Sequence, residues 1–416
     1  MSTRASLFAS WRLPSTFASL RYRNYRLWFF GQTVSLIGTW MQSVAQGWLV
    51  YELTGSRLAL GTISFAGSLP TLFLMLPAGA LADRVPKRKL LMLTQTAMMS
   101  FAFTLATLAA TGVLRVWHIA ILATGLGIVN SFDAPARQTL AVDMVDDRRD
   151  LMNAIAMNSM VFNLARIVGP AIGGIVLASL GATWCFALNG LSFLAVLIAL
   201  WRMRLPHLVR APQTESFAAQ IVVGLRYIRG NASIRTIILL VGISSLFGFS
   251  YATLMPAFAV DVLHVGETGL GTMSAAVGAG ALTGSLAVAS LAQSRRKGWL
   301  LTAGSLIFPS ALLSFGNSHS FPLSLVFLMI IGFGWVTQNA TSNTLVQAIV
   351  PDELRGRVMA AYSLMFFGTA PFGALLAGSL AQAWGPSAAV ALCAGVTLAF
   401  AVGLLLATPT LRRIEQ

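Results

Sequence analysis

The chain has 416 residues, of which 56% are hydrophobic and only 10% are charged. Soluble domains carry about 25% charged residues, so this composition excludes an ordinary soluble protein and predicts one that spans a membrane. The net charge of +15 does not indicate nucleic-acid binding, because the bases fall in clusters between apolar runs and form no basic face. At about 20 apolar residues per crossing helix, the length accommodates about a dozen spans and no soluble domain.

The first span is expected at 27–51, after an N-terminal segment (1–26) in which arginines alternate with aromatic and leucine residues. Such a mixture is typical of the cytoplasmic membrane surface. The polar residues of the span recur every three or four positions and share one helical face. That face either lines a cavity or bonds to another helix, and the spacing leaves both interpretations open. It consists of Gln32, Ser35, Thr39, Gln42 and Gln46.

A basic loop is expected at 79–89, between the second span (59–82) and the third (90–111). One acid is followed by four bases within six residues, a charge pattern that favours the cytoplasmic side. The loop resembles the signature Gly-x-Leu-x-Asp-Arg-x-Gly-Arg-Arg of the major facilitator superfamily, with Pro86 at the second glycine. The matching residues are Gly79, Asp83, Arg84, Lys87 and Arg88.

The fourth span is expected at 117–134, ending at Asp133, and a charged loop at 135–150 leads to the fifth span at 151–178. The fifth span contains Gly-Pro-x-x-Gly-Gly, formed by Gly169, Pro170, Gly173 and Gly174. This resembles the fifth-helix signature of drug:proton antiporters in the same superfamily. Glycines there let helices approach closely and proline bends the span; ordinary small-residue packing is the alternative.

A sixth span is expected to end near Trp201. The segment that follows is the longest polar one in the chain, and apolar residues recur at helical spacing within it. We expect an amphipathic helix on the inner membrane surface there. Six further spans are expected at 236–262, 268–292, 299–317, 322–348, 357–382 and 387–408. The resulting organisation is a six-helix half (27–203), a cytoplasmic linker (204–235), a second six-helix half (236–408) and a cytoplasmic tail (409–416).

The distribution of bases supports twelve spans with both termini inside. All but three of the 28 bases fall in segments expected on the inner side. The exceptions are Arg57 and Arg115 in outer loops and Arg166 within the fifth span. The halves also repeat weakly, since Gly169-x4-Gly174 matches Gly373-x4-Gly378. Two parallel six-helix repeats are the plan of the superfamily that the motifs resemble.

The resemblance covers almost the whole chain. More narrowly, the chain resembles the branch that contains enterobactin exporters and macrolide-efflux proteins. The residues that carry it include 20–25, 35–38, 53–56 and the two motifs above. The resemblance implies a secondary-active, proton-coupled exporter of small amphiphilic molecules, such as siderophores or drugs, that works by alternating access. A lysophospholipid flippase and a transporter-like sensor without transport are the alternatives. That branch often has an acid where this chain has Thr39, so the proton carrier is not identified.

The resemblance also implies a conformational gate on the cytoplasmic side. In the outward-facing state Asp83 would face the N-terminus of the eleventh span, where the helix dipole favours an anion. Arg84, Lys87 or Arg88 would pair with Asp133 in that state. Among the acids, none is expected at mid-membrane, and Asp133 is expected near an inner end.

A substrate cavity is expected where polar or aromatic residues fall inside the first, fifth, seventh, tenth and eleventh spans. The expected lining is Gln32, Thr39, Gln42, Gln46, Asn163, Arg166, Phe247, Tyr251, Trp335, Gln338, Asn339 and Phe366. Arg166 has two interpretations: it bonds carbonyls freed by Pro170 or amides such as Asn163, or it faces the cavity and attracts anions. A charge at that depth is costly and is usually paired or functional.

The sequence predicts no enzyme. It has no phosphate-binding loop and no metal-ligand cluster, so no cofactor, metal or ATP drive is expected. The expected partners are a small molecule, protons and the lipid bilayer. The interpretation in which Arg166 faces the cavity predicts that the small molecule is anionic. We expect a monomer in the bacterial inner membrane.

Overall fold

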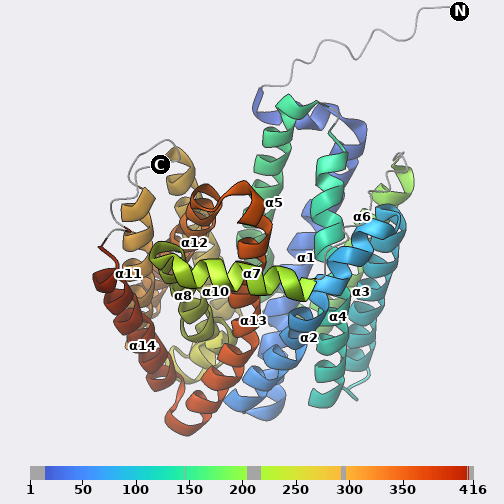
Figure 1. Cartoon of the computed structure of the whole chain (residues 1–416). Helices are drawn as coiled ribbons and strands as arrows, with labels where there is room; N and C mark the ends of the chain where they lie inside the picture. The colour runs from blue at the N-terminus through green and yellow to red at the C-terminus, as the bar shows by residue number, and fades with distance from the viewer. Residues whose placement is uncertain (1–14, 146, 204–216, 292–296, 410, 412–416) are drawn as a thin grey trace, which may run out of the picture.

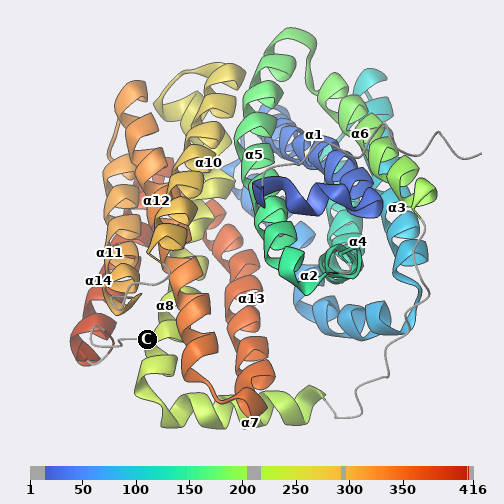
Figure 2. The same cartoon turned by 90° about the horizontal axis from the view of Figure 1, so that it is seen from above.

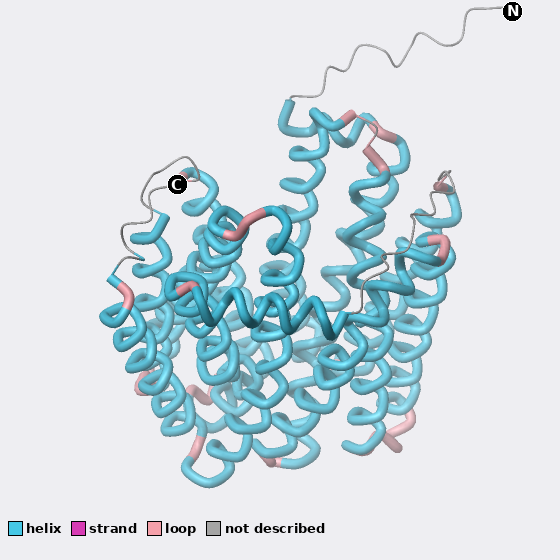
Figure 3. The backbone as a smooth tube through the Cα atoms, in the orientation of Figure 1, coloured by secondary structure: helices cyan, strands magenta, loops and turns pink. Residues whose placement is uncertain are grey.

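The computed structural model describes residues 15–145, 147–203, 217–291, 297–409 and 411 (Figure 1). Nearly all of this part is helical, and it contains no strand (Figure 3). Eleven of its helical segments are long and apolar enough to cross a membrane. The first long helix is not among them, and its polar residues lower its hydropathy, so a count of twelve spans stays a prediction.

The N-terminal half is a bundle of six long helices preceded by a short 3-10 helix. These elements are η1 (Ser15–Arg21), α1 (Arg23–Thr54), α2 (Arg57–Arg84), α3 (Lys87–Ala110), α4 (Val116–Asp143), α5 (Arg148–Leu180) and α6 (Ala182–Arg202). Within this half α1 packs against α5 and α6, while α4 packs against α2 and α3.

The C-terminal half begins with an interrupted helix and continues with five uninterrupted ones. Its elements are α8 (Ala232–Ile243), η2 (Ser244–Gly248), η3 (Phe249–Leu254), α9 (Met255–Ala257), η4 (Phe258–Val262), α10 (Gly266–Ser290), α11 (Lys297–Gly316), α12 (Phe321–Ile349), α13 (Asp352–Trp384) and α14 (Pro386–Ala407). Figure 2 shows the two halves side by side. A separate helix, α7 (Phe217–Gly230), lies across the direction of the long helices (Figures 1 and 2).

Two predicted loops are mostly helix. The α2 helix continues to Arg84, so the loop expected at 79–89 shrinks to Val85 and Pro86 before α3 begins. Proline restricts the residue before it and lacks an N–H, which explains why α2 stops there. The prediction of a loop at 135–150 was also wrong for most of its length, because α4 runs through Pro135 to Asp143. Its last turns bury Ala136 and Leu140 against the core, and this burial stabilises the extension.

These helix ends define two ends of the bundle. The basic end is where α2 ends and α3 begins with Lys87, Arg88 and Lys89. The opposite end is where α1 passes to α2 through Gly55, whose φ of 58° lies in the left-handed region that glycine adopts readily.

The halves meet through glycines on two pairs of helices, α5 with α10 and α2 with α13. A Cβ atom on Gly174 would lie 2.9 Å from the Cα of Gly271, and one on Gly378 would lie 2.9 Å from the Cα of Gly61. Backbones this close leave no room for a side chain, as in other closely packed membrane helices. Both contacts lie in the parts of these helices nearer the opposite end.

The two halves repeat the same glycine packing at corresponding positions, as the Gly-x4-Gly repeat in the sequence suggested. A Cβ on Gly169 would approach the carbonyl oxygen of Ile37 in α1 at 2.8 Å, and one on Gly373 would collide with that of Leu246 in η2. The first glycine of each Gly-x4-Gly pair therefore packs inside its own half. The second packs across to the other half.

Candidate functional site

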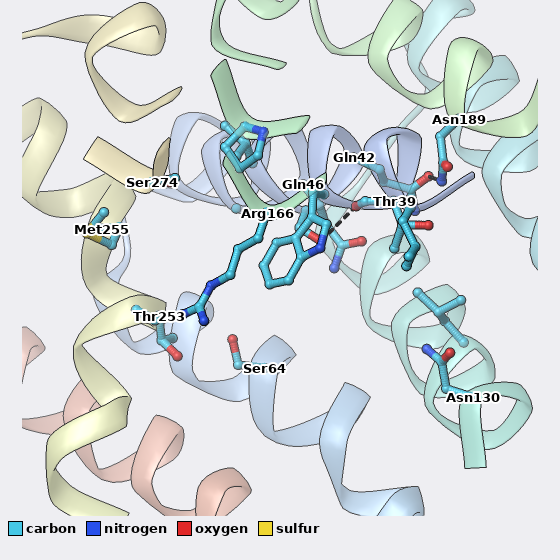
Figure 4. Close-up of a pocket in the computed structure, with 18 of the residues that line it drawn as sticks. Thr39, Gln42, Gln46, Ser64, Asn130, Arg166, Asn189, Thr253, Met255 and Ser274 are labelled. Carbon is cyan, nitrogen blue, oxygen red and sulfur yellow. Dashed lines mark hydrogen bonds between the residues drawn. The ribbon is translucent and has the colours of Figure 1, made fainter. Parts of the chain in front are cut away.

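A cavity of about 570 Å³ lies between the halves (Figure 4). All six long helices of the N-terminal half contribute to its wall, and η3, α9 and α10 close it from the C-terminal half. A cavity of this size suits a small organic molecule, since ligand pockets typically measure about 300–1,000 Å³. In the part of the chain that the structure describes, no group of three or more His, Cys, Asp or Glu residues could hold a metal.

The polar face of α1 lies along this cavity. Gln32, Thr39, Gln42 and Gln46 all belong to the lining, because their spacing puts them on the helical face turned towards it. Gln42 also accepts a hydrogen bond of 2.7 Å from Nδ2 of Asn189 on α6. Both interpretations of the polar face therefore hold at Gln42: it lines the cavity and bonds to a neighbouring helix.

Arg166 lies in the cavity wall on α5, about 27 Å along the helix from its first residue. Its guanidinium carbon lies 5.8 Å from the ring centre of Trp40 on α1, a cation–π geometry. Figure 4 shows the side chain extending towards Ser64 and Thr253. Among the described residues it has no ion pair, and Asn163 donates to its own helix at the Ser159 carbonyl instead.

Asp133 is a buried acid in the cavity wall, which corrects the expectation of an acid near a helix end. It is 1% exposed, and α4 continues for about 15 Å beyond it. Its Oδ1 accepts hydrogen bonds from Thr94 Oγ1 at 2.8 Å and from Gln95 Nε2 at 2.9 Å. Its Oδ2 lies 3.5 Å from Nε of Arg137, one turn further along α4. These partners offset the cost of burying a carboxylate.

The C-terminal half reaches the cavity through its interrupted helix. Two π-helical turns, η2 and η4, flank the 3-10 turn η3, and this break brings Phe249, Tyr251 and Thr253 to the cavity. Such irregular turns are frequent at functional sites. At Gly248 a Cβ would lie 2.5 Å from the Phe308 ring, so the break depends on a glycine at a close approach.

Several residues expected in the cavity lie elsewhere. Trp335 stacks on Phe249 with ring centres 4.8 Å apart and also contacts Phe308 and Phe366, so Trp335 and Phe366 pack in the core of the C-terminal half. Phe249 lines the cavity, and the rings of Trp335 and Phe366 pack on the side of Phe249 away from it. The others outside the described lining are Asn163, Phe247, Gln338 and Asn339.

The two amide residues among these are engaged on α12. Gln338 is fully buried and bonds to Ser244 Oγ through its Nε2 at 2.9 Å. Asn339 donates to the Trp335 carbonyl at 2.9 Å. No described residue of α12 belongs to the cavity lining, and sequence position alone did not show that this helix packs away from the cavity.

The residues of the fifth-helix motif pack rather than line the cavity, apart from Pro170. Gly173 would place a Cβ 3.1 Å from the Cα of Met41 on α1. Together with Gly169 and Gly174, it lets α5 lie close to both α1 and α10.

At the basic end the expected partners of Asp133 are otherwise engaged in this structure. Lys87 forms an ion pair with Asp143, and Arg88 donates to the Trp201 carbonyl at 2.8 Å. The reason is distance along the helix: Asp143 ends α4, about 15 Å further towards the basic end than Asp133. Arg84 is exposed and Gly79 has open space around it. The side chain of Asp83 lies outside the described part.

A network at the opposite end was missed by sequence reasoning. Arg57 of α2 donates to Oδ2 of Asp261 on η4 from Nε at 3.0 Å and from Nη2 at 2.6 Å. Tyr51 of α1 donates to the same oxygen at 2.5 Å. The one available signal was that Arg57 is among the few bases expected on the outer side.

The matches to known proteins agree with this architecture. The model of the transmembrane secretion effector family matches residues 14–416. The multidrug efflux pump Tap of Mycolicibacterium fortuitum is 30% identical over 359 residues, covering 84% of this chain and 87% of that protein. The enterobactin exporter EntS of Shigella boydii is 26% identical over 400 residues, covering 94% and 93%.

Further matches come from another siderophore system and from solved structures. The staphyloferrin A transporter of Staphylococcus aureus is 26% identical over 364 residues, covering 86% of this chain and 90% of that protein. A crystal structure of the peptide transporter POT bound to alafosfalin superposes with a TM-score of 0.75 at 13% identity, covering 97% of this chain and all of that one. The chain belongs to the transmembrane secretion effector family of the major facilitator superfamily, and it is a multi-pass membrane transporter rather than an enzyme.

Proposed function

We propose that this transporter is a secondary-active exporter of small amphiphilic molecules, such as siderophores or drugs, in the bacterial cytoplasmic membrane. The observation that carries the proposal is the cavity between the halves, where the polar face of α1 meets an apolar wall that includes Met98, Phe193 and Phe249. Such a cavity can bind both parts of an amphiphilic molecule. Relatives named as an efflux pump and as siderophore transporters support this substrate class.

The charges support an orientation with the basic end in the cytoplasm and both termini inside. Bases gather at the ends of α2, α3 and α6, whereas the opposite end has Arg57 and Arg115 among the described residues. In this orientation the structure is inward-facing, because the glycine contacts and the Arg57–Asp261 pair close the outer side. At the basic end, a Cβ on Gly79 or Gly356 would meet nothing within 4 Å.

These contacts support a mechanism of alternating access. Opening outward requires Gly174 to part from Gly271 and Arg57 to part from Asp261, while the basic ends of the halves close. Asp83 would then face the start of α13, where the helix N-terminus favours an anion. Substrate binding or protons from the membrane gradient would shift the balance between the two states.

The proposal is tested in proteoliposomes that hold the full chain and carry an imposed pH gradient, acidic inside. A panel of siderophores, macrolides and cationic dyes is added outside. Gradient-driven accumulation of at least one compound, abolished by an uncoupler, is expected. If no compound of the panel accumulates more than in empty liposomes, export is contradicted. If accumulation is the same with and without the pH gradient, proton coupling is contradicted.

A further inference from the structure

Arg166 places a positive charge where the two halves meet. A Cβ on Gly278 of α10 would lie 2.7 Å from the Arg166 carbonyl oxygen, so the backbone of Arg166 belongs to the crossing of α5 and α10. From this crossing the guanidinium extends towards Ser64 of α2 and Thr253 of η3 (Figure 4). A group bound to the guanidinium would therefore lie between side chains of both halves.

The charges of the cavity do not cancel. Among its described lining residues the charged ones are Asp133, Arg137 and Arg166. Asp133 already has Arg137 as its partner at 3.5 Å and accepts two further hydrogen bonds. The cavity therefore carries one uncompensated positive charge, and that charge is on Arg166. In a site shielded from water, such a charge attracts anions strongly.

The surroundings of Arg166 hold its guanidinium without neutralising it. The Trp40 ring lies under the guanidinium at 5.8 Å and is itself braced edge-on by Phe162, with ring centres 5.9 Å apart. A cation–π contact uses the face of the guanidinium, and its N–H donors point outward along the edges. No described protein group accepts a hydrogen bond from those donors. The side chain is thus oriented, charged and open to an acceptor from the cavity.

We infer that Arg166 binds an anionic group of the transported molecule, such as a carboxylate. The planar fork of a guanidinium matches the two oxygens of such a group. The apolar part of the molecule would lie against Phe249 or Phe193, which line the same cavity. The inference rests on the proposed function and narrows its substrate class to amphiphilic anions.

The test measures binding to the detergent-solubilised full chain with three probes that share one apolar body. These are 2-naphthoate, neutral 2-naphthamide and the cation 2-naphthylmethylammonium. Charge-assisted hydrogen bonds to an arginine predict that naphthoate binds about 10-fold or more tightly than naphthamide. Arg166→Gln is expected to reduce that ratio to about one, and Arg166→Lys to retain part of it because the charge survives.

Two measurements make the outcome decisive. Unchanged naphthamide affinity in Arg166→Gln shows that the cavity is still folded, and Arg115→Gln removes an arginine at the opposite end as the matched control. An anion preference that survives in Arg166→Gln would overturn the inference, and so would a wild-type preference for the cation. The binding assay does not depend on transport. If Arg166 binds the anion but no compound is transported in proteoliposomes, only the proposed function is contradicted.

Discussion

Arg57 and Asp261 form the one ion pair among the described residues that joins the two halves. The Nη2 atom of Arg57 lies 2.6 Å from Oδ2 of Asp261, and Nη1 of Arg57 lies 3.4 Å from the Ala381 carbonyl oxygen on α13. Gln382 of α13 accepts a 3.0 Å hydrogen bond from the Arg57 backbone N–H. The start of α2 is thus held to two elements of the C-terminal half, whereas the other described ion pairs each lie within one half.

Asp261→Asn is expected to open the opposite end. The substitution removes the charge that holds Arg57 and Tyr51, and hydrogen bonds to charged groups contribute about 1.5–3 kcal/mol each. Spin labels at Val113 and Trp384, both exposed at this end on different halves, report the separation. We expect the longer-distance population to grow about 10-fold relative to wild type.

The control for this prediction is Glu52→Gln. It removes an exposed acid next to Tyr51 that has no ion pair with the other half in the described structure. An Asp261→Asn distribution that matches both wild type and this control would show that the pair does not hold the outer side closed.

Gly271→Ala is also expected to open the opposite end, in this case by disturbing the packing of α5 against α10. Its Cβ would lie 2.6 Å from the Pro170 carbonyl oxygen and 2.7 Å from the Cα of Gly174, so the two backbones have to move apart. The Val113–Trp384 distance should then lengthen in the substituted protein. Gly403→Ala on α14 is the matched control, because its Cβ would meet nothing within 4 Å. Equal distributions in the two variants would contradict a tight α5–α10 contact.

Cysteine labelling distinguishes the cavity lining from the core. Cysteines at Thr39, Gln46 and Ser274 line the cavity and should react with a small water-soluble maleimide. Cysteines at Gln338 and Phe366 should react slowly, because these positions pack inside the C-terminal half. Both native cysteines are buried and serve as the internal reference for unreactive thiols. Rapid labelling at Gln338 would place α12 on the cavity.

Local patterns predicted the helices well because they record the face that each helix buries. The three- and four-residue spacing on α1 identified cavity residues. The Gly-x4-Gly repeat indicated two similar halves, and the structure places its second glycines at the two crossings between them. Patterns failed where tertiary packing decides. Nothing local shows that Trp335 lies behind Phe249, or that α4 continues through Pro135 and leaves Asp133 deep in the wall.

The pairing at the opposite end was equally invisible in the sequence. Arg57 and Asp261 are far apart in the chain, and Arg57 was expected only in an outer loop. Their contact follows from how the halves pack, and in the proposed alternating-access cycle it belongs to one conformational state. A sequence pattern contains no information on that state.

The last prediction concerns the unequal burial of Asp133 and Arg137. The carboxylate side chain is 1% exposed, whereas the guanidinium side chain is 30% exposed. Arg137→Gln leaves a buried charge with only Thr94 and Gln95 as partners, and we expect it to lower the free energy of unfolding by about 1–3 kcal/mol. Asp133→Asn should cost less, because Arg137 can turn towards water and an amide oxygen can still accept from Thr94.

Thermal unfolding in detergent, followed by tryptophan fluorescence, measures the two single variants and the double variant. The double variant should be more stable than Arg137→Gln alone, because it no longer buries an unpaired charge. Arg355→Gln is the control: its partner Asp352 is 80% exposed, and exposed pairs contribute about 0–1 kcal/mol. If Asp133→Asn is the more destabilising single change, the charge on Asp133 itself holds α3 to α4, and Arg137 plays no part in stabilising it.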